Sequence, residues 1–244
     1  MGKADSGMDR PFVFINVAAT ADGKIDTIAR RGATISSGRD KLRVERLRAD
    51  SDAIMVGGKT LHGDDPKLTI QSEQLRLERK RRGRPENPMK VAVATRLQLT
   101  PGCNFLAAGP ARIKLFTTSQ TPEADVRRLK QAGAEVHIGG DARVDLQWVL
   151  ATLKEAGVQR LMVEGGATLN FELLQLGAVD ELMIFIGPLV FGGETAPTLA
   201  GGSGLAAEAA IRLELLTCEQ WEDGGVLLRY KTLHQGRGVR AGEE

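Results

Sequence analysis

The sequence is poor in aromatic residues, cysteine and histidine, and each shortage excludes a class of protein. Aromatic residues make up 4% of the 244 positions, so a surface on which single-stranded nucleic acid stacks its bases is not expected. The two cysteines, Cys103 and Cys218, stand at no metal or redox spacing and are expected to be free thiols, which favours a reducing, cytoplasmic compartment. With three histidines and no further cluster of ligands, the chain indicates no metal centre.

The sequence also lacks a strong net charge and a long apolar run. A net charge of +2 at pH 7 gives no argument for a polyanionic partner such as nucleic acid. The longest apolar run, residues 182–186, is far shorter than the ~20 residues that a membrane helix needs, so no membrane partner is expected. The N-terminal MGKADSGMDRP has no apolar core of a signal peptide. Residues 1–10 and 233–244 are expected to be mobile tails.

What the chain does contain is a regular alternation of short apolar runs and helix-like segments. Strands are predicted at residues 12–19, 53–56, 90–95, 112–118, 135–138 and 160–163, and helices at 38–49, 121–132, 145–156 and 166–176. This alternation favours an α/β layer with a parallel sheet. The last three predicted strands, 181–186, 211–218 and 226–230, have no helix between them and therefore predict antiparallel pairing at one edge. We expect one domain over residues 11–232 with a mixed, mostly parallel sheet.

Two helical segments are expected for different reasons. Residues 38–49 follow Ser37, a suitable N-cap, and Leu42 and Leu47 are predicted to point inward. The segment 72–84, SEQLRLERKRRGR, is strongly basic and has few apolar residues. Its composition predicts a solvated helix or arm rather than a nucleic-acid site.

The stretch VGGKTLHGDDPKLT, residues 56–69, begins like a phosphate-binding P-loop. The full P-loop pattern needs a glycine where this chain has Ala53, and it must run directly into a helix. Gly63 and Pro66 are expected to prevent a helix there, so the P-loop interpretation fails. His62, Asp64 and Asp65 could form part of a metal site, but the two carboxylates could equally cap a turn by accepting backbone N–H bonds.

Three further glycine-containing turns follow predicted strands. In VEGGATL, residues 163–169, paired glycines precede a helix, whose free N–H groups could bind an anion at the carboxyl end of a strand. GPLVFGG, residues 187–193, predicts a tight turn. In NVAATADGKI, residues 16–25, a buried strand breaks into an Asp-Gly turn. Such a loop could be a simple connection or could cover a bound ligand.

Together these elements resemble the riboflavin-biosynthesis pyrimidine reductases, which include stand-alone archaeal and fungal enzymes and the reductase half of bacterial deaminase–reductases. The matching stretches are NVAATADGKI, RLRADSDAIMVG, KTLHGDDPKLT, PENPMKVAV, VEGGATLNFEL and GPLVFGG. The resemblance implies a dihydrofolate-reductase-like three-layer α/β/α fold, NADPH as hydride donor and a homodimer. It implies reduction of the ribosyl side chain of a pyrimidinone 5′-phosphate to ribityl, which is catalysis mainly by positioning.

The resemblance also implies roles for individual residues. The positions that match cofactor contacts are Ala18, Thr60, Asp64, Thr95, Gly165, Gly166, Ala167, Thr168 and Leu169. The positions that match substrate contacts are Asn16, Arg48, Leu68 and Glu164, where the fork of Arg48 suits a phosphate. Asp22 and Lys24 lie in the loop over the reaction centre and are the catalytic candidates, although solvent could also deliver the proton.

The zinc signature of the deaminase half, His-x-Glu with Pro-Cys-x-x-Cys, is absent from this chain. A stand-alone reductase resembles the archaeal and fungal enzymes, in which reduction precedes deamination. This resemblance implies the diamino substrate, 2,5-diamino-6-ribosylamino-4(3H)-pyrimidinone 5′-phosphate. Two departures from the family pattern, Gly32 in place of serine and Gln71 in place of a basic residue, leave other substrates open. These are the deaminated pyrimidinone and a pterin- or folate-like molecule. A non-catalytic NADP-binding paralogue is a third alternative, against which the intact Thr60 and Asp64 argue.

Overall fold

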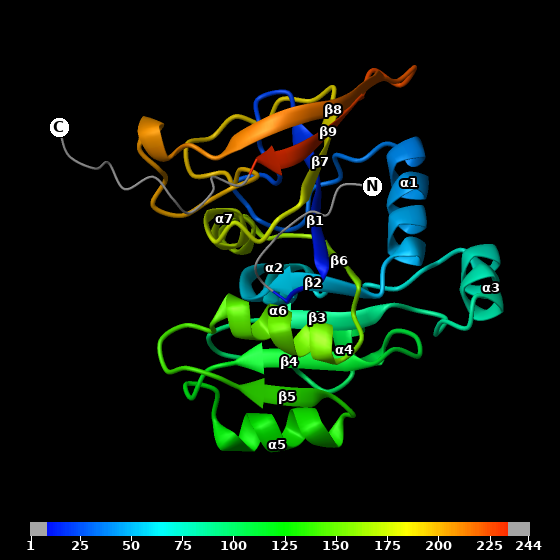
Figure 1. Cartoon of the computed structure of the whole chain (residues 1–244), viewed down its shortest axis with the longest axis vertical. Coiled ribbons are helices and arrows are strands. Elements are labelled where there is room, and N and C mark those ends of the chain that lie inside the picture. The colour runs from blue at the N-terminus through cyan, green and yellow to red at the C-terminus, as the bar shows by residue number, and fades with distance from the viewer. Residues whose placement is uncertain (1–8, 234–244) are drawn as a thin grey trace.

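A computed structural model of the protein describes residues 9–233 and has a single large sheet at its centre (Figure 1). The strands are β1 (Phe12–Thr20), β2 (Ala53–Gly57), β3 (Met89–Val93), β4 (Ile113–Thr117), β5 (Glu135–Ile138), β6 (Arg160–Val163), β7 (Glu181–Gly187), β8 (Arg212–Gln220) and β9 (Val226–Leu233). In the described chain their order is β5-β4-β3-β2-β6-β1-β7-β9-β8. From β5 to β7 all neighbouring strands pair in parallel. At the other edge, β9 pairs antiparallel with both β7 and β8. The predicted mixed, mostly parallel sheet is confirmed.

Helices cover both faces of the parallel part of the sheet. They are α1 (Gly38–Asp50), α2 (Gly58–Asp64), α3 (Glu73–Arg81), α4 (Asn104–Ala107), α5 (Glu123–Gln131), α6 (Leu146–Glu155) and α7 (Ala167–Gln175), with a 3₁₀ turn at Ala207–Ala209. One core cluster joins α6 and α7 to the sheet, and another joins α1, α2, α4 and α5 to the opposite face. The predicted three-layer α/β/α arrangement is therefore confirmed.

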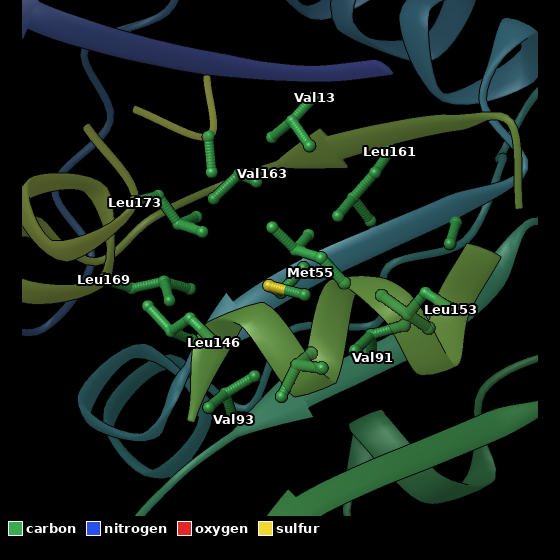
Figure 2. Close-up of a cluster of buried hydrophobic side chains, with 14 of the residues drawn as sticks. Val13, Met55, Val91, Val93, Leu146, Leu153, Leu161, Val163, Leu169 and Leu173 are labelled. Carbon is green, nitrogen blue, oxygen red and sulfur yellow. The ribbon is translucent and has the colours of Figure 1, made fainter. Parts of the chain in front are cut away.

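The core follows from the alternation of side chains along buried strands. In β1, Val13 and Ile15 belong to one core cluster and Phe14 to the other, so consecutive residues serve opposite faces. Figure 2 shows the first cluster, where Leu153 of α6 and Leu173 of α7 reach the same layer of strand side chains. Because parallel strands are buried on both faces, nearly every residue in them is apolar. This is why the apolar runs marked the strands so clearly.

The helices predicted within residues 38–49 and 72–84 are present as α1 and α3, but the predicted burial of one residue in each helix is wrong. Ser37 caps α1 by accepting the Asp40 N–H, and Leu47 packs inward as predicted. Leu42 does not, because it is 73% exposed on the side of α1 that faces a cleft. The basic segment forms the largely exposed α3, but Arg79 is buried and donates to two carbonyl groups at the C-terminal end of α1.

The prediction that residues 61–66 carry no helix is wrong, since α2 runs from Gly58 to Asp64. The helix is short enough for Gly63 to fall in its last turn, and it ends at Asp65 in the left-handed conformation before Pro66. Asp65 does cap a backbone, as one interpretation held: its carboxylate accepts the N–H groups of Asn104 and Phe105 at 2.8 and 3.0 Å.

The packed part of the chain begins earlier than predicted. Arg10 is buried, and its guanidinium forms a bidentate ion pair with Asp180 at 2.7 and 2.9 Å. The expectation of a mobile tail is therefore wrong at Arg10, and it is also wrong at Leu233, which is the last residue of β9 and pairs with Arg212. The tails predicted for residues 1–8 and 234–244 lie outside the described residues. No helix found between residues 9 and 233 combines the length and apolar character of a membrane span.

His137 lies in a stacked group at the β4–β5 edge and gives stability a dependence on pH. Its ring stacks on Phe116 with centroids 4.8 Å apart, and its Nε2 lies 3.2 Å from the Lys114 ammonium. Burial and then Lys114 lower the pKa of His137, against the opposing pull of Glu135. An imidazole whose pKa is lowered by folding stabilises the protein above its unfolded pKa, and this contribution is lost as pH falls through the folded value.

We therefore expect the thermal midpoint of the wild type to fall between pH 7 and pH 5, partly because His137 must take up a proton. His137→Phe keeps the stacked ring but cannot titrate, so its midpoint should fall less steeply over this range. Thermal unfolding followed by circular dichroism at several pH values measures both slopes. Equal slopes in the two proteins would show that His137 does not contribute.

Candidate functional site

A cleft of about 1650 Å³ opens along the carboxyl edge of the parallel sheet. Residues directly after three adjacent strands line it: Ala94 follows β3, Gly58 follows β2 and Glu164 follows β6. Ala18, near the end of β1, continues the lining across the next strand. Open α/β sheets bind ligands at this edge, because loops there are free to differ while the strands hold their ends in place. The cleft is therefore the candidate functional site.

The glycine pair after β6 shapes one wall of the cleft. The peptide between Gly165 and Gly166 is cis, and the Gly165 carbonyl accepts the N–H of Gly57 at 2.8 Å, which ties the β6 loop to the end of β2. Gly166 is the N-cap of α7 and forms no side-chain hydrogen bond to the first N–H groups of that helix, and Gly166, Ala167 and Thr168 line the cleft. A Cβ on Gly166 would lie 2.9 Å from the Thr60 hydroxyl oxygen. Backbone donors are thus exposed where an anionic group could bind.

The structure brings all of the predicted cofactor positions into this one cleft. They are Ala18, Thr60, Asp64, Thr95, Gly165, Gly166, Ala167, Thr168 and Leu169. They come from β1 and from the loops and helices that follow β2, β3 and β6, which the sequence alone could not place side by side. Their assignment to a cofactor stays a prediction.

Asp64 lies at the end of α2 and faces the loop that follows β1. Burial, and to a smaller degree the neighbouring Asp26 carboxylate, raises the pKa of Asp64. Asp26 was not predicted, yet it shapes this loop by accepting the N–H groups of Thr27, Gly32 and Ala33 at 2.7 to 3.0 Å. The only sequence signal for it was its place shortly after the Asp-Gly turn.

Arg48 and Glu164, predicted as separate substrate contacts, form one ion pair on the other wall. Nε and Nη2 of Arg48 donate to the two carboxylate oxygens of Glu164 at 2.7 and 2.8 Å, and Nη1 donates to the Thr69 carbonyl at 3.1 Å. Burial alone would lower the pKa of Arg48, but the attraction of Glu164 raises it overall. Three of the five N–H donors of the Arg48 guanidinium are thus used within the protein, and its contact with a substrate phosphate stays a prediction.

Asn16 lines the cleft and Leu68 does not. The Asn16 carboxamide oxygen accepts a hydrogen bond from Arg43 at 2.7 Å, a partner that the sequence gave no reason to expect. Leu68 has a positive φ of 47°, and its side chain is buried in the core cluster that includes Leu61. Its side chain therefore cannot make the predicted substrate contact without leaving the core.

The structure gives Asp22 a role other than the predicted proton transfer. Its carboxylate accepts the Thr20 hydroxyl at 2.5 Å and the N–H groups of Phe191 and Gly192 at 3.2 and 2.7 Å. The Thr20 hydroxyl is the main cause of a lowered pKa for Asp22. A carboxylate with a lowered pKa holds the GPLVFGG turn but is a poor proton donor. Lys24 forms a backbone bridge with Thr198, and neither Asp22 nor Lys24 lines the cleft.

Three cationic side chains of the cleft wall have no hydrogen-bond or ion-pair partner among residues 9–233: those of Lys41, Lys59 and Arg96. Lys59 and Arg96 belong to the segments that follow β2 and β3, on the side of the predicted cofactor positions. Lys41 lies on α1, on the side of Arg48. Unpaired cations facing a cleft are suited to phosphate groups. Sequence analysis missed them because a surface lysine or arginine has no pattern that marks it as unpaired.

The fold and the cleft define an α/β protein with a large cleft at the carboxyl edge of its parallel strands. The chain belongs to the family of the RibD C-terminal domain, whose family model matches residues 11–227. A 2,5-diamino-6-ribosylamino-4(3H)-pyrimidinone 5′-phosphate reductase of Archaeoglobus fulgidus is 42% identical over 202 residues, which cover 83% of this chain and 91% of the relative.

An archaeal relative of the same name from Methanothermobacter thermautotrophicus is 40% identical over 207 residues, covering 84% of this chain and 91% of the relative. Among solved structures, a pyrimidine reductase-like protein from Corynebacterium diphtheriae has the same fold, with a TM-score of 0.80 at 19% identity, covering 92% and 93% of the two chains. The resemblance predicted from the sequence motifs is confirmed. Both relatives are named as reductases, and the predicted oxidoreductase is confirmed.

Proposed function

We propose that the protein is an NADPH-dependent reductase of riboflavin biosynthesis. Its reaction converts the ribosyl side chain of 2,5-diamino-6-ribosylamino-4(3H)-pyrimidinone 5′-phosphate to the ribityl product. The observation that carries the proposal is the single cleft into which all nine predicted cofactor positions converge, in a chain 42% identical to a relative of that name. The intact Thr60 and Gly165-Gly166 wall supports an active cofactor site over a non-catalytic paralogue.

The residues of the cleft fit a dinucleotide cofactor laid across the strand ends. The uncapped N-terminus of α7 offers backbone donors for the diphosphate, and a side chain on Gly166 would fill that space. Lys59 and Arg96 carry unpaired charge that suits the extra phosphate distinguishing NADPH from NADH. When bound, NADPH supplies the hydride, and the protein's part is to hold the cofactor and the substrate in register.

On the opposite wall, Glu164 and Asn16 offer an acceptor and a donor for a polar ring, and Lys41 offers a free charge for the substrate phosphate. Lys41 takes this role because Arg48 is already paired and Gln71 carries no charge. The proton that accompanies the hydride then comes from solvent, since Asp22 is committed to the backbone of the GPLVFGG turn and Lys24 does not line the cleft. We place the enzyme in the cytoplasm, in keeping with its two free thiols.

The proposal is tested by following the absorbance of NADPH with three candidate substrates: the diamino pyrimidinone phosphate, its deaminated counterpart and dihydrofolate. Oxidation of NADPH with the diamino compound at the highest kcat/KM supports the proposal. Preference for the deaminated compound or for dihydrofolate would replace it with the corresponding alternative. Tight NADPH binding with no turnover of any of the three would indicate a non-catalytic paralogue.

We also propose that the protein is a homodimer formed through the β8 edge of the sheet. Every residue of β8 is exposed, and no helix of the described chain covers it (Figure 1). Leu213, Leu215 and Leu216 add an apolar surface to an unpaired strand edge, a combination that single domains avoid. A second copy of the chain that pairs or packs along β8 would bury both the leucine surface and the unpaired strand edge.

Leu215→Lys is expected to shift the protein from dimer to monomer, because a charge on an edge strand disfavours pairing. Ile138→Lys is the matched control, since Ile138 is similarly exposed (51% against 52%) on β5 at the opposite edge of the sheet. Light scattering after size-exclusion chromatography measures the mass. A dimer that survives Leu215→Lys but not Ile138→Lys would move the interface to β5.

A further inference from the structure

Asn16 presents an unused hydrogen-bond donor to the cleft. Its side chain lines the cleft although the residue is only 8% exposed, and its Oδ1 accepts from Arg43 Nη2 at 2.7 Å. A guanidinium can only donate, so the atom of Asn16 that faces Arg43 has to be oxygen, and the NH₂ group points away from it. Within residues 9–233 that NH₂ group has no protein partner, and it is not sealed from solvent. A nearly buried donor of this kind is completed by an acceptor on a ligand.

Arg43 is itself held in place before any ligand arrives. Its Nε donates to Asp40 at 2.9 Å, and the other oxygen of that buried carboxylate accepts the Ser36 hydroxyl at 2.5 Å. A chain of hydrogen bonds therefore runs from the first turn of α1 through Arg43 to Asn16. The Asn16 carboxamide cannot rotate without breaking a charge-assisted hydrogen bond, which is roughly twice as strong as a neutral one.

The neighbours of Asn16 indicate which ligand group its NH₂ meets. In the parallel pairing of β1 with β6, Ile15 lies opposite Val163, so Asn16 and Glu164 are the next residues at the same level. A donor thus stands beside a carboxylate acceptor. A pyrimidinone ring presents the complementary edge, a carbonyl oxygen beside an N–H. Ala18, the matched cofactor position, lies two residues nearer the end of β1.

We propose that Arg43 is a positioning residue, which fixes the Asn16 carboxamide so that its NH₂ donates to the ring carbonyl of the substrate. This inference rests on the proposed function, because the ring belongs to the proposed substrate. It concerns substrate recognition and not cofactor binding. The two residues therefore act as a unit, in which Arg43 contributes only through Asn16.

Asn16→Asp tests the donor, because it keeps the shape and the contact with Arg43 but replaces the NH₂ group by oxygen. Its kcat/KM for the diamino pyrimidinone phosphate should fall about 100-fold, since the ring carbonyl of the substrate then faces the carboxylate of the introduced aspartate and has no donor. Arg43→Met tests the positioning and should lower kcat/KM about 10-fold, with Arg43→Lys recovering part of the loss. The Kd of NADPH should change less than about threefold in each variant.

A double-mutant cycle separates positioning from general support of the fold. In an Asn16→Ala background, Arg43→Met should cause no further loss of kcat/KM, whereas a merely structural Arg43 would cause the same loss in both backgrounds. Arg46→Met is the matched control, because Arg46 lies on the same helix and pairs with Glu78 outside the cleft. Thermal midpoints of all variants show that each is folded.

The outcomes distinguish this inference from the function on which it rests. A wild-type protein that binds NADPH and leaves the pyrimidinone unreduced overturns the proposed function. It also overturns the ring carbonyl as the hydrogen-bond partner of Asn16. A wild type that reduces the pyrimidinone, together with Asn16→Asp at unchanged kcat/KM, overturns the inference alone. Additive effects in the cycle overturn the positioning role of Arg43.

Discussion

Arg48→Met is expected to destabilise the protein by about 3 kcal/mol and to abolish measurable reduction of the pyrimidinone, because removing one partner of a desolvated ion pair leaves the other charge uncompensated. Both side chains are largely buried, and the Glu164 carboxylate receives two hydrogen bonds from Arg48. The Thr69 carbonyl loses its donor in the same variant. Equilibrium unfolding in urea measures the loss of stability, and NADPH oxidation measures the loss of activity.

A second substitution separates the two effects. Arg48→Met combined with Glu164→Leu replaces the whole ion pair by apolar side chains and should recover most of the lost stability, since such replacements are often neutral or stabilising. Activity should stay lost, because Glu164 is also the predicted acceptor for the substrate ring. Arg46→Met, which breaks the exposed pair with Glu78, should change the free energy of unfolding by less than ~1 kcal/mol. A double variant as unstable as the single one would mean that the pair is not the source of the loss.

The strands and most helices could be predicted because their signals are local. Apolar runs in β1 to β4 are nearly continuous, and such runs mark strands buried on both faces. The helix α2 was missed because its local signals disfavour a helix, Gly63 above all. The helix forms because its seven residues end before Pro66 and because Leu61 packs into the core. Leu42 was misplaced because helical spacing alone does not show which part of an apolar stripe faces a cleft.

The glycine-containing turns at the strand ends could be predicted from motifs, because glycines and helix starts carry their own signal. The contacts of the cleft wall that holds Arg48 could not, since they join residues far apart in the chain. Arg48 and Glu164 are separated by 116 positions, and Asp22 is held by a turn about 170 positions away. Whether a carboxylate is a proton donor, an anchor or half of an ion pair depends on such partners. The roles of Asp22, Arg48 and Asn16 therefore needed the fold.

Gly166→Ala is expected to raise the Kd of NADPH about 100-fold, because the added methyl group overpacks the space between the start of α7 and Thr60. The backbone at Gly166 lies at φ −76°, a value that alanine readily adopts. The added methyl carbon would lie 2.9 Å from Thr60 Oγ1 and would turn the hydroxyl away from its predicted cofactor contact. Binding is measured by titrating the protein with NADPH and following cofactor fluorescence.

Two further proteins make the result specific to this contact. Gly38→Ala adds the same methyl group at the start of α1, where nothing lies within 4 Å, and should bind NADPH like the wild type. Gly166→Ala combined with Thr60→Ser should recover part of the affinity, because serine keeps the hydroxyl and lacks the second substituent that restricts its rotation. If Gly166→Ala binds NADPH as tightly as the wild type, the cofactor does not lie against the start of α7. The glycine pair would then serve only to let the β6 loop approach Gly57.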